Sequence, residues 1–355
     1  MKLLKLQLNS FRNYGKFELE FDSKKPITLI TGENGKGKTN ILEAVYILSV
    51  GKTFRGAHQE DLIKWGMDFF TVKGDLNLGD ETMNLDVSFS TYPRKIKSFR
   101  INEVKTPHAE YLGSLITVLF HPKDLNMLYL EPSLRRKYLN LILSQTDKYY
   151  LEALTNYTRI LKQRNALLEE VGKGGRSQGE LDVWDEHLAK EGEIIVTKRK
   201  ELIEYFNSHI QALYREISGG NESLTIEYES SSGDGNEFLK KLRLKREKDI
   251  RYSTTTVGPH RDDIKFLLQN RRIEEFASRG EFRTILITMK IAEIGYIKKT
   301  KKNYPVLLLD DVFSELDEQR QAHLFKAISG CQAIITTTEA HPKMIEKDKI
   351  KVIEI

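Results

Sequence analysis

The chain contains little cysteine and no long apolar run. Its 355 residues include one cysteine, Cys331, which excludes a disulfide framework and a cysteine-rich metal site. The longest apolar stretches, such as residues 306–309, are far shorter than the roughly 20 residues that a membrane-spanning helix needs. The amino terminus alternates apolar and polar residues from Leu4 to Leu8, as a strand does, and lacks the unbroken apolar block of a signal peptide. These absences predict a soluble cytoplasmic protein with no membrane partner.

Charge and composition are those of a globular chain. Lysine and arginine number 56 and the acids 51, so the net charge of +5 permits an anionic partner without requiring one. Hydrophobic residues make up 39% and charged residues 30%, which allows a core and is unlike a disordered chain. The length suggests two or three domains.

The pattern of elements predicts an α/β domain built from both ends of the chain. The first 120 residues show mostly strand patterns, interrupted by one helix expected over residues 38–49. From residue 132 to about residue 218, apolar residues recur at helical spacing, with a glycine-rich connection at residues 172–179. Strands and helices alternate again near the carboxyl end, as in parallel βαβ units. We therefore expect an α/β domain made of residues 1–121 and 251–355, and an inserted, mainly helical lobe made of residues 122–250.

A glycine-rich segment predicts a phosphate-binding loop. Residues 32–39, Gly-Glu-Asn-Gly-Lys-Gly-Lys-Thr, fit the pattern G-x-x-x-x-G-K-T completely, between an apolar strand and an amphipathic helix. Glycines let the backbone wrap round a phosphate with its N–H groups pointing inward. Lys38 would reach the β- and γ-phosphates of a nucleotide, and the Thr39 hydroxyl would bind Mg²⁺.

Two acids that follow an apolar strand predict the second half of the site. Residues 306–309 are apolar, and Asp310 and Asp311 come directly after them. Asp310 is placed to hold Mg²⁺, and Asp311 to polarise the attacking water, which makes Asp311 and Lys38 the expected catalytic residues. Alone, such a pair usually ends a strand or caps a helix; beside a phosphate loop the metal interpretation is favoured.

A third element lies at the expected start of a helix near residue 281. Ser278 and Gly280 could form an anion site there, although alone they would be an ordinary helix cap. The segment comes 240 residues after Lys38 and 32 residues before Asp310.

These motifs together resemble the ABC-type ATPase heads of the SMC/RecF group, and within it the RecF family of recombination and repair proteins. The phosphate loop extended to Asn40 has the form that this group uses. Ser278-Arg279-Gly280 looks like the ABC signature, and the stretch from Ser314 to Asp317 looks like the D-loop. Further stretches typical of the RecF family are residues 11–14, 161–168, 258–263 and 309–317, so the resemblance covers nearly the whole chain.

The resemblance implies a fold and a mechanism. The fold would be an ABC-type P-loop ATPase head with an inserted helical lobe. ATP would be sandwiched between the phosphate loop of one subunit and Ser278 and Gly280 of another, and the D-loop would cross the interface. ATP with Mg²⁺ would hold a homodimer that clamps DNA without sequence preference, and slow, DNA-stimulated hydrolysis would release it. RecF-like proteins act at gaps and stalled forks, where they help load the RecA recombinase with RecO and RecR.

The resemblance also names candidate binding residues. For ATP they are Gly32, Glu33, Asn34, Gly35, Lys36, Gly37, Lys38, Thr39, Asn40 and Arg12. Arg12 has an equally weighted alternative, a surface salt bridge. Basic runs that could neutralise DNA phosphates contain Arg135, Arg136, Lys240, Lys241, Arg243, Lys245 and Arg246. A single run of this kind is usually a solvated helix face, so the resemblance, more than the charges, predicts DNA binding.

The sequence departs from the family pattern at two places. Glu281 stands where the family usually has Gln, which puts a negative charge near the partner's nucleotide. Residues 116–122 offer no Gln of the kind that senses Mg²⁺ in ABC heads, and the sequence does not identify a replacement. His341, beyond the last apolar strand, is interpreted as a surface residue.

Three other classes share part of this pattern. The nucleotide-binding subunit of a membrane transporter has a much shorter helical insert and a Glu after the strand Asp. A P-loop kinase would have no reason to carry residues 278–280 or 314–317. A nucleotide-gated binding module without turnover stays open as an alternative, because Asp311 is one methylene shorter than Glu.

Overall fold

The computed structural model describes residues 1–79, 81–233, 237–338 and 347–355, apart from the side chains of Ser314, Glu315 and Lys347. These residues form two compact units. Unit 1 consists of residues 1–125, 213–219 and 279–355, and unit 2 of residues 126–212 and 220–278. Within the described ranges, no helix is both long and apolar enough to cross a membrane.

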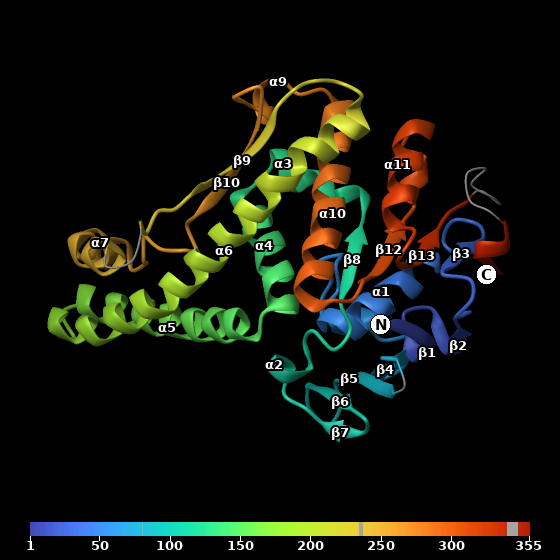
Figure 1. Ribbon diagram of the computed structural model, residues 1–355. Coiled ribbons are helices and arrows are strands. Elements are labelled where there is room, and N and C mark those ends of the chain that lie inside the picture. Colours follow the sequence, from blue (N-terminus) through green and yellow to red (C-terminus); the bar gives the residue numbers. More distant parts are fainter. Residues whose placement is uncertain (80, 234–236, 339–346) are drawn as a thin grey trace. The chain divides into compact units, whose positions relative to one another are not determined.

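Unit 1 is built on a five-stranded parallel sheet. The order is β14 (Ile350–Glu354), β3 (Ile27–Thr31), β13 (Gln332–Thr336), β12 (Val306–Asp310) and β8 (Thr117–Phe120). Every residue of β8, β12 and β13 is buried, as expected for central strands of a parallel sheet covered on both faces. The chain therefore places β3 from its first tenth between two strands from its last residues (Figure 1).

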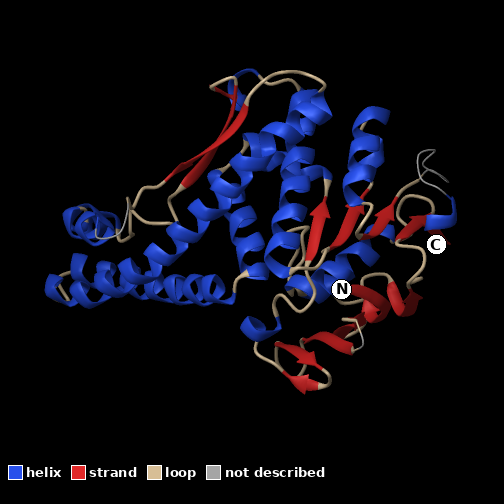
Figure 2. Ribbon diagram, in the orientation of Figure 1, coloured by secondary structure: helices blue, strands red, loops and turns tan. Residues whose placement is uncertain are grey.

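Helices cover both faces of this sheet. Leu307 and Leu309 belong to an apolar cluster with residues of α10 (Arg279–Lys301) and α11 (Glu318–Ile328). On the other face, α1 (Lys38–Val50) contacts β12 and β13, and it also contacts β4 and β5 of a second sheet (Figure 2). Because α1 lies between two sheets, every residue from Ile41 to Val50 is buried.

The second sheet of unit 1 is antiparallel and has six strands. Their order is β2 (Tyr14–Glu20), β1 (Lys2–Phe11), β4 (Phe69–Asn77), β5 (Thr82–Ser90), β6 (Ile96–Ile101) and β7 (Val104–Lys105). Short helices η1 (Glu60–Leu62), α2 (His108–Tyr111), η2 (Pro122–Leu125), η4 (Val312–Glu315) and η5 (Lys347–Lys349) complete the unit.

Unit 2 is mainly helical. Its helices are α3 (Asn126–Tyr129), α4 (Pro132–Thr146), α5 (Lys148–Gly172), η3 (Gln178–Glu180), α6 (Leu181–Ser218, whose last turns group with unit 1), α7 (Glu237–Leu244), α8 (Arg246–Tyr252) and α9 (Ile273–Phe276). A small antiparallel sheet has the order β11 (Arg271–Arg272), β10 (Asp263–Leu268) and β9 (Leu224–Glu229).

The expected α/β class with a helical insertion is confirmed, and the limits of the two units differ from those expected. Residues 251–278 group with unit 2, whereas the sequence pattern placed them in the α/β domain. The reason is the full pairing of β10 with β9, from Asp263 with Glu229 to Leu268 with Leu224. Strand patterns show that both segments are strands, but they do not show which strand each one joins.

Candidate nucleotide site

The phosphate loop joins β3 to α1. Its glycines are needed because their φ angles are positive and because a side chain at two of them would collide with neighbouring atoms. Gly32, Gly35 and Gly37 have φ angles of 147°, 85° and 111°, which other residues rarely adopt. A Cβ at Gly32 would lie 2.4 Å from the main-chain oxygen of Ile355, and one at Gly37 would lie 2.6 Å from the side-chain nitrogen of Asn13. The loop is therefore held closely on two sides by other parts of unit 1.

Lys38 folds back over this loop. Its Nζ donates hydrogen bonds to the carbonyl oxygens of Gly32, at 2.6 Å, and Glu33, at 3.0 Å. Lys38 is 9% exposed and is the first residue of α1, at the end of the helix where the dipole favours an anion. Glu33, Asn34, Gly35 and Lys36 are exposed. A phosphate that enters the loop would meet the Lys38 ammonium and the backbone N–H groups.

The carboxylate at the end of β12 meets the residue that follows Lys38. Thr39 Oγ1 donates to Asp310 Oδ1 at 2.8 Å, and Thr336 Oγ1 donates to the same oxygen at 2.9 Å. The parallel sheet produces this meeting, because the carboxyl ends of β3, β12 and β13 lie along one edge. Hydroxyl and carboxylate oxygens are ligands that Mg²⁺ prefers, so Thr39 and Asp310 fit the ion. When bound beside a nucleotide, Mg²⁺ neutralises charge on the phosphate oxygens.

Asp311 has an unusual backbone conformation. Its φ is 50° and its N–H donates to the carbonyl oxygen of Thr336 at 3.2 Å. A non-glycine residue in this left-handed region is strained, and it persists where neighbouring structure holds it. The strain falls at the residue expected to polarise water.

Residues 11–14 support the phosphate loop from the side. Asn13 Nδ2 donates to the Lys36 carbonyl oxygen at 2.9 Å and its Oδ1 accepts from Asn40 Nδ2 at 2.8 Å. The Tyr14 hydroxyl donates to the Gly37 carbonyl oxygen at 3.2 Å. Burial raises the pKa of Tyr14 to about 12, so the hydroxyl stays protonated and remains a donor at neutral pH. Asn40 thus acts on the loop through Asn13.

Arg12 forms a salt bridge, as in its alternative role, but with a buried acid and not at the surface. Its Nε and Nη2 bind both carboxylate oxygens of the fully buried Glu43, at 2.8 and 2.9 Å, and Nη1 donates to the Asp61 carbonyl oxygen. These contacts orient the guanidinium toward α1, and a direct ATP contact by Arg12 stays a prediction. Arg55, which the sequence analysis missed, contacts the end of the extended loop: its Nη1 donates to Asn40 Oδ1 at 3.0 Å and lies 3.9 Å from Glu43 Oε2.

His121, from the stretch that offered no Gln, lies beside Asp310. Its Nε2 lies 3.6 Å from Asp310 Oδ2, and its Nδ1 accepts the Lys123 N–H at 3.1 Å. Burial lowers the pKa of His121, which favours a neutral ring with the proton on Nε2, facing Asp310. Asp124 accepts a hydrogen bond from the main-chain N–H of His121 and forms an ion pair, at 3.3 Å, with the buried Lys290 of α10. His121 therefore connects Asp310 to α10 through Asp124.

The signature residues begin α10 and are linked to α11. Ser278 and Arg279 are exposed, as a site that serves a second subunit requires. The Gly280 carbonyl oxygen accepts from Thr284 Oγ1 at 3.1 Å, and Thr284 Oγ1 accepts from Arg320 Nε at 2.8 Å.

The D-loop residues lie at the start of α11. Asp317 caps that helix by accepting the Arg320 N–H at 2.9 Å and also binds the Arg320 guanidinium. The side chain of Ser314 lies outside the described residues.

Three of the expected DNA contacts have structural roles in unit 2. Arg135 is 5% exposed and binds Asp263 at 2.7 and 2.8 Å. Arg136 donates to the Asp262 carbonyl oxygen at 2.7 Å, and Arg246 binds Asp182 and Asp185, each at 2.6 Å. Arg135 and Arg246 are ion-paired, which leaves their charges less free to neutralise phosphates, whereas the carbonyl contact of Arg136 does not neutralise its charge. Contact of these three arginines with DNA stays a prediction. Lys240, Arg243 and Lys245 are exposed, whereas Lys241 is partly buried and lies 3.9 Å from Glu237.

Residues 258–263 fix a largely buried turn of unit 2. Asp262 accepts hydrogen bonds from Tyr228, Ser231 N and Ser231 Oγ. His260 Nδ1 lies 2.6 Å from the Tyr157 hydroxyl, and Nε2 lies 3.0 Å from the Thr255 carbonyl oxygen.

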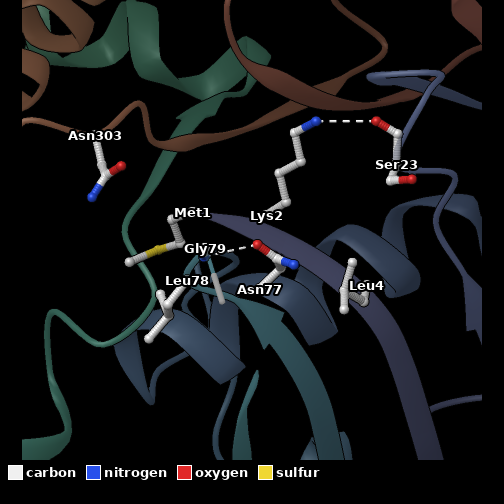
Figure 3. Close-up of a pocket in the computed structure, with 8 residues that line it drawn as sticks. All are labelled: Met1, Lys2, Leu4, Ser23, Asn77, Leu78, Gly79 and Asn303. Atoms are coloured by element: carbon white, nitrogen blue, oxygen red, sulfur yellow. Dashed lines mark hydrogen bonds between the residues drawn. The ribbon is translucent and has the colours of Figure 1, made fainter. Parts of the chain in front are cut away.

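A cavity of about 390 Å³ lies elsewhere in unit 1 (Figure 3). It is lined by Met1, Lys2, Leu4, Ser23, Asn77, Leu78, Gly79 and Asn303. None of these residues belongs to the phosphate loop or to the acid pair, so the cavity is not part of the nucleotide site.

Comparisons with known proteins agree with this geometry. Residues 2–354 match the family described as RecF/RecN/SMC N terminal domain. The DNA replication and repair proteins RecF of Bacillus thuringiensis (strain Al Hakam) and Bacillus cereus (strain B4264) are each 36% identical over 350 residues, which is 95% of this chain and 92% of theirs.

Solved structures also resemble this chain. A structure of the recombination mediator protein RecF with ATP, in the RecFOR pathway, superposes with a TM-score of 0.90 at 33% identity, covering 97% of this chain and 93% of that one. The Smc head bound to the C-winged helix domain of ScpA gives a TM-score of 0.56 at 19% identity over 95% of this chain and 90% of that one, which shows a shared fold alone.

Proposed function

Because the chain belongs to the RecF/RecN/SMC N-terminal domain family, we propose that it is an ATP-dependent DNA-binding protein of recombinational repair and replication restart. The observation that carries the proposal is the 2.8 Å hydrogen bond between Thr39 and Asp310, which brings together a phosphate loop and a metal carboxylate 271 residues apart in the sequence. The relatives named for DNA replication and repair match over 95% of the chain, which supports the same role here.

In the proposed site, each residue has one task. The loop backbone and Lys38 bind the β- and γ-phosphates, and the Lys38 ammonium exchanges its two carbonyl contacts for phosphate oxygens. Thr39 and Asp310 hold Mg²⁺. Asp311 accepts a proton from the attacking water.

A second copy of the chain completes the site. The exposed Ser278 and the partly buried Gly280, at the amino end of α10, contact the γ-phosphate bound by the partner subunit. Their link through Thr284 and Arg320 to Asp317 connects the signature to the D-loop. ATP therefore holds the dimer, and hydrolysis removes the phosphate that both subunits share.

The ATP-bound dimer clamps DNA through its backbone, at gaps or stalled forks. Sequence-independent contacts by exposed cations such as Lys240 and Lys245 support this kind of binding. The relatives' place in the RecFOR pathway supports RecO- and RecR-type mediators as protein partners and loading of the RecA recombinase as the outcome.

The first experiment measures Mg²⁺-dependent ATP hydrolysis per subunit across protein concentrations, with and without linear duplex DNA. We expect the rate to rise with protein concentration and again with DNA. Asp311→Asn should bind ATP and dimerise but lose hydrolysis, Lys38→Ala should lose ATP binding, and Asp348→Asn, an exposed acid outside the site, should match the wild type.

The same data test the alternatives. A rate per subunit that ignores protein concentration and DNA would refute the sandwiched dimer and the DNA clamp. Unchanged turnover in Asp311→Asn would remove that residue from the mechanism. ATP-dependent DNA binding with no measurable turnover would instead favour a nucleotide-gated binding module.

A further inference from the structure

Exposed apolar side chains gather at one end of the antiparallel sheet of unit 1. Among the described residues, fifteen large apolar side chains are exposed, and five of them fall within residues 65–69 and 92–96. We call these five the aromatic patch: Trp65, Met67, Phe69, Tyr92 and Ile96. Trp65 is 98% exposed and Tyr92 is 75% exposed.

Strand register and hydrogen bonds bring the two segments together. Phe69 pairs with Ser90, and Ser90 pairs with Ile96, so Phe69 and Ile96 stand on one face on either side of Ser90. Beyond the strands, the N–H and hydroxyl of Thr91 both donate to the Asp68 carbonyl oxygen, at 2.8 and 3.1 Å. Trp65, Met67 and Tyr92 therefore belong to two loops that lie side by side.

The patch is held in a fixed conformation. Trp65 and Gly66 are the central residues of a tight turn, closed by a 3.0 Å hydrogen bond from Met67 N to the Lys64 carbonyl oxygen. Gly66 has a φ of 81°, which the third position of a type II turn requires. An ion pair between Lys95 and Glu60 joins the two loops again. A rigid turn that presents an indole to solvent loses little conformational entropy when a partner binds.

The side chains match a protein-binding surface better than a nucleic-acid surface. Trp, Tyr, Phe, Met and Arg are the residues enriched at protein interfaces, and Trp, Tyr and Arg dominate their binding energy. Residues 60–68 and 91–96 contain three acids, Glu60, Asp61 and Asp68, and three cations, Lys64, Arg94 and Lys95. This balance gives no net attraction for a polyanion.

The charges also indicate what the partner offers. Lys95 is paired with Glu60, and Lys64 Nζ lies 3.4 Å from the Asn13 carbonyl oxygen. The exposed Arg94 has no ion pair within the part of the chain that the structure describes.

We propose that the aromatic patch is the docking surface for a different, folded protein, which offers an apolar pocket for the Trp65 indole and a carboxylate for Arg94. This inference rests on the proposed function, which names RecO- and RecR-type mediators as partners. Those two proteins are the candidates that the test uses.

The experiment uses the full-length protein and the purified RecO- and RecR-type mediators of the same genome. The chain has two tryptophans, so a Trp184→Phe background leaves Trp65 as the only indole reporter. We expect one mediator to shift the Trp65 emission to the blue. Trp65→Ala should weaken binding of that mediator about 30-fold, as expected for an interface hot spot, and Arg94→Glu should weaken it about tenfold. ATP hydrolysis by these variants should stay within twofold of the wild type.

One control variant and three possible outcomes test the proposed docking surface. Tyr252→Ala removes a 61% exposed aromatic ring of unit 2 and should leave mediator binding unchanged. If the wild type binds a mediator and Trp65→Ala binds it equally well, the surface is wrong while the proposed function stands. If the wild type binds neither mediator, the partner assignment in the proposed function fails, and this inference fails with it. An emission change that needs only single-stranded DNA, or only ATP and more of this chain, would overturn the assignment to a different protein.

Discussion

Protonation of His260 should limit the stability of unit 2 in acid. Its neutral ring makes two contacts that require opposite roles: Nδ1 accepts from the Tyr157 hydroxyl, and Nε2–H donates to the Thr255 carbonyl oxygen. Burial, together with the charges of Arg261 and Arg136, lowers the pKa of His260 from 6.5 to about 4. A second ring proton would convert the acceptor Nδ1 into a donor that faces a hydroxyl.

The size of the effect follows from the shift of the pKa. The unfolded chain takes up the proton near pH 6.5 and the folded chain only near pH 4, so folding is favoured by the neutral ring. The contribution of the neutral ring to the free energy of unfolding is complete above pH 6.5. It falls as the pH drops and is lost below about pH 4. At 1.36 kcal/mol per unit, the full loss is roughly 3 kcal/mol.

The assay is urea unfolding between pH 7 and pH 4, followed by Trp184 fluorescence in a Trp65→Phe background. His260→Gln should lower the free energy of unfolding at pH 7, since it disturbs two buried hydrogen bonds, by about 1–3 kcal/mol. Between pH 6.5 and pH 4, the free energy of unfolding of His260→Gln should fall less than that of the wild type, and the difference should reach up to about 3 kcal/mol. His209→Gln, at an exposed position of the same unit, should keep the slope of the wild type. Equal slopes for His260→Gln and the wild type would refute the reasoning.

Three further predictions concern the phosphate loop, the core of unit 2 and the signature. Gly37→Ala should weaken ATP binding at least about tenfold in a fluorescent-nucleotide titration, because its Cβ would lie 2.6 Å from Asn13 and the φ of 111° disfavours alanine. Gly175→Ala is the control. Equal ATP affinity of Gly37→Ala and the wild type would contradict the loop geometry. Arg164→Met should lower the free energy of unfolding by about 3–5 kcal/mol, since it removes the guanidinium that binds the buried Asp185 at 2.6 Å and the buried Asp249 at 2.8 Å, although Asp185 keeps its ion pair with Arg246. A loss under about 1 kcal/mol in urea would contradict this. Glu281→Gln removes a negative charge beside the signature and should strengthen ATP-dependent dimerisation in sedimentation experiments. Weaker dimerisation would show instead that Glu281 supports the contact between the two subunits.

The local parts of the nucleotide site could be predicted from the sequence. A phosphate loop is a continuous pattern between a strand and a helix, and the expected helix at residues 38–49 ends one residue before α1 does. Asp310 could be assigned because parallel strands end at one edge of the sheet, and its contact with Thr39 follows from that topology.

Features that depend on distant pairing could not be predicted. The sequence analysis assigned Arg135 and Arg246 to basic runs, because the acids that neutralise them are distant in the chain: Asp263 lies 128 residues from Arg135. His121 carried no signal as a neighbour of Asp310, since β8 was not recognised as the strand beside β12. The two segments of the aromatic patch are each too short to form a pattern, and only the register of β4, β5 and β6 joins them.

The position of β3 in the parallel sheet has a consequence for synthesis on the ribosome. This strand leads into the phosphate loop, yet both of its neighbours, β13 and β14, come roughly 300 residues later in the chain. At about 5–20 residues per second, translation needs on the order of 15–60 s to deliver them. During that interval, both edges of β3 lack their native strands, and such edges invite association with other chains. A nascent chain of this protein should therefore depend on ribosome-associated chaperones until its last strands emerge, and should acquire nucleotide binding only then.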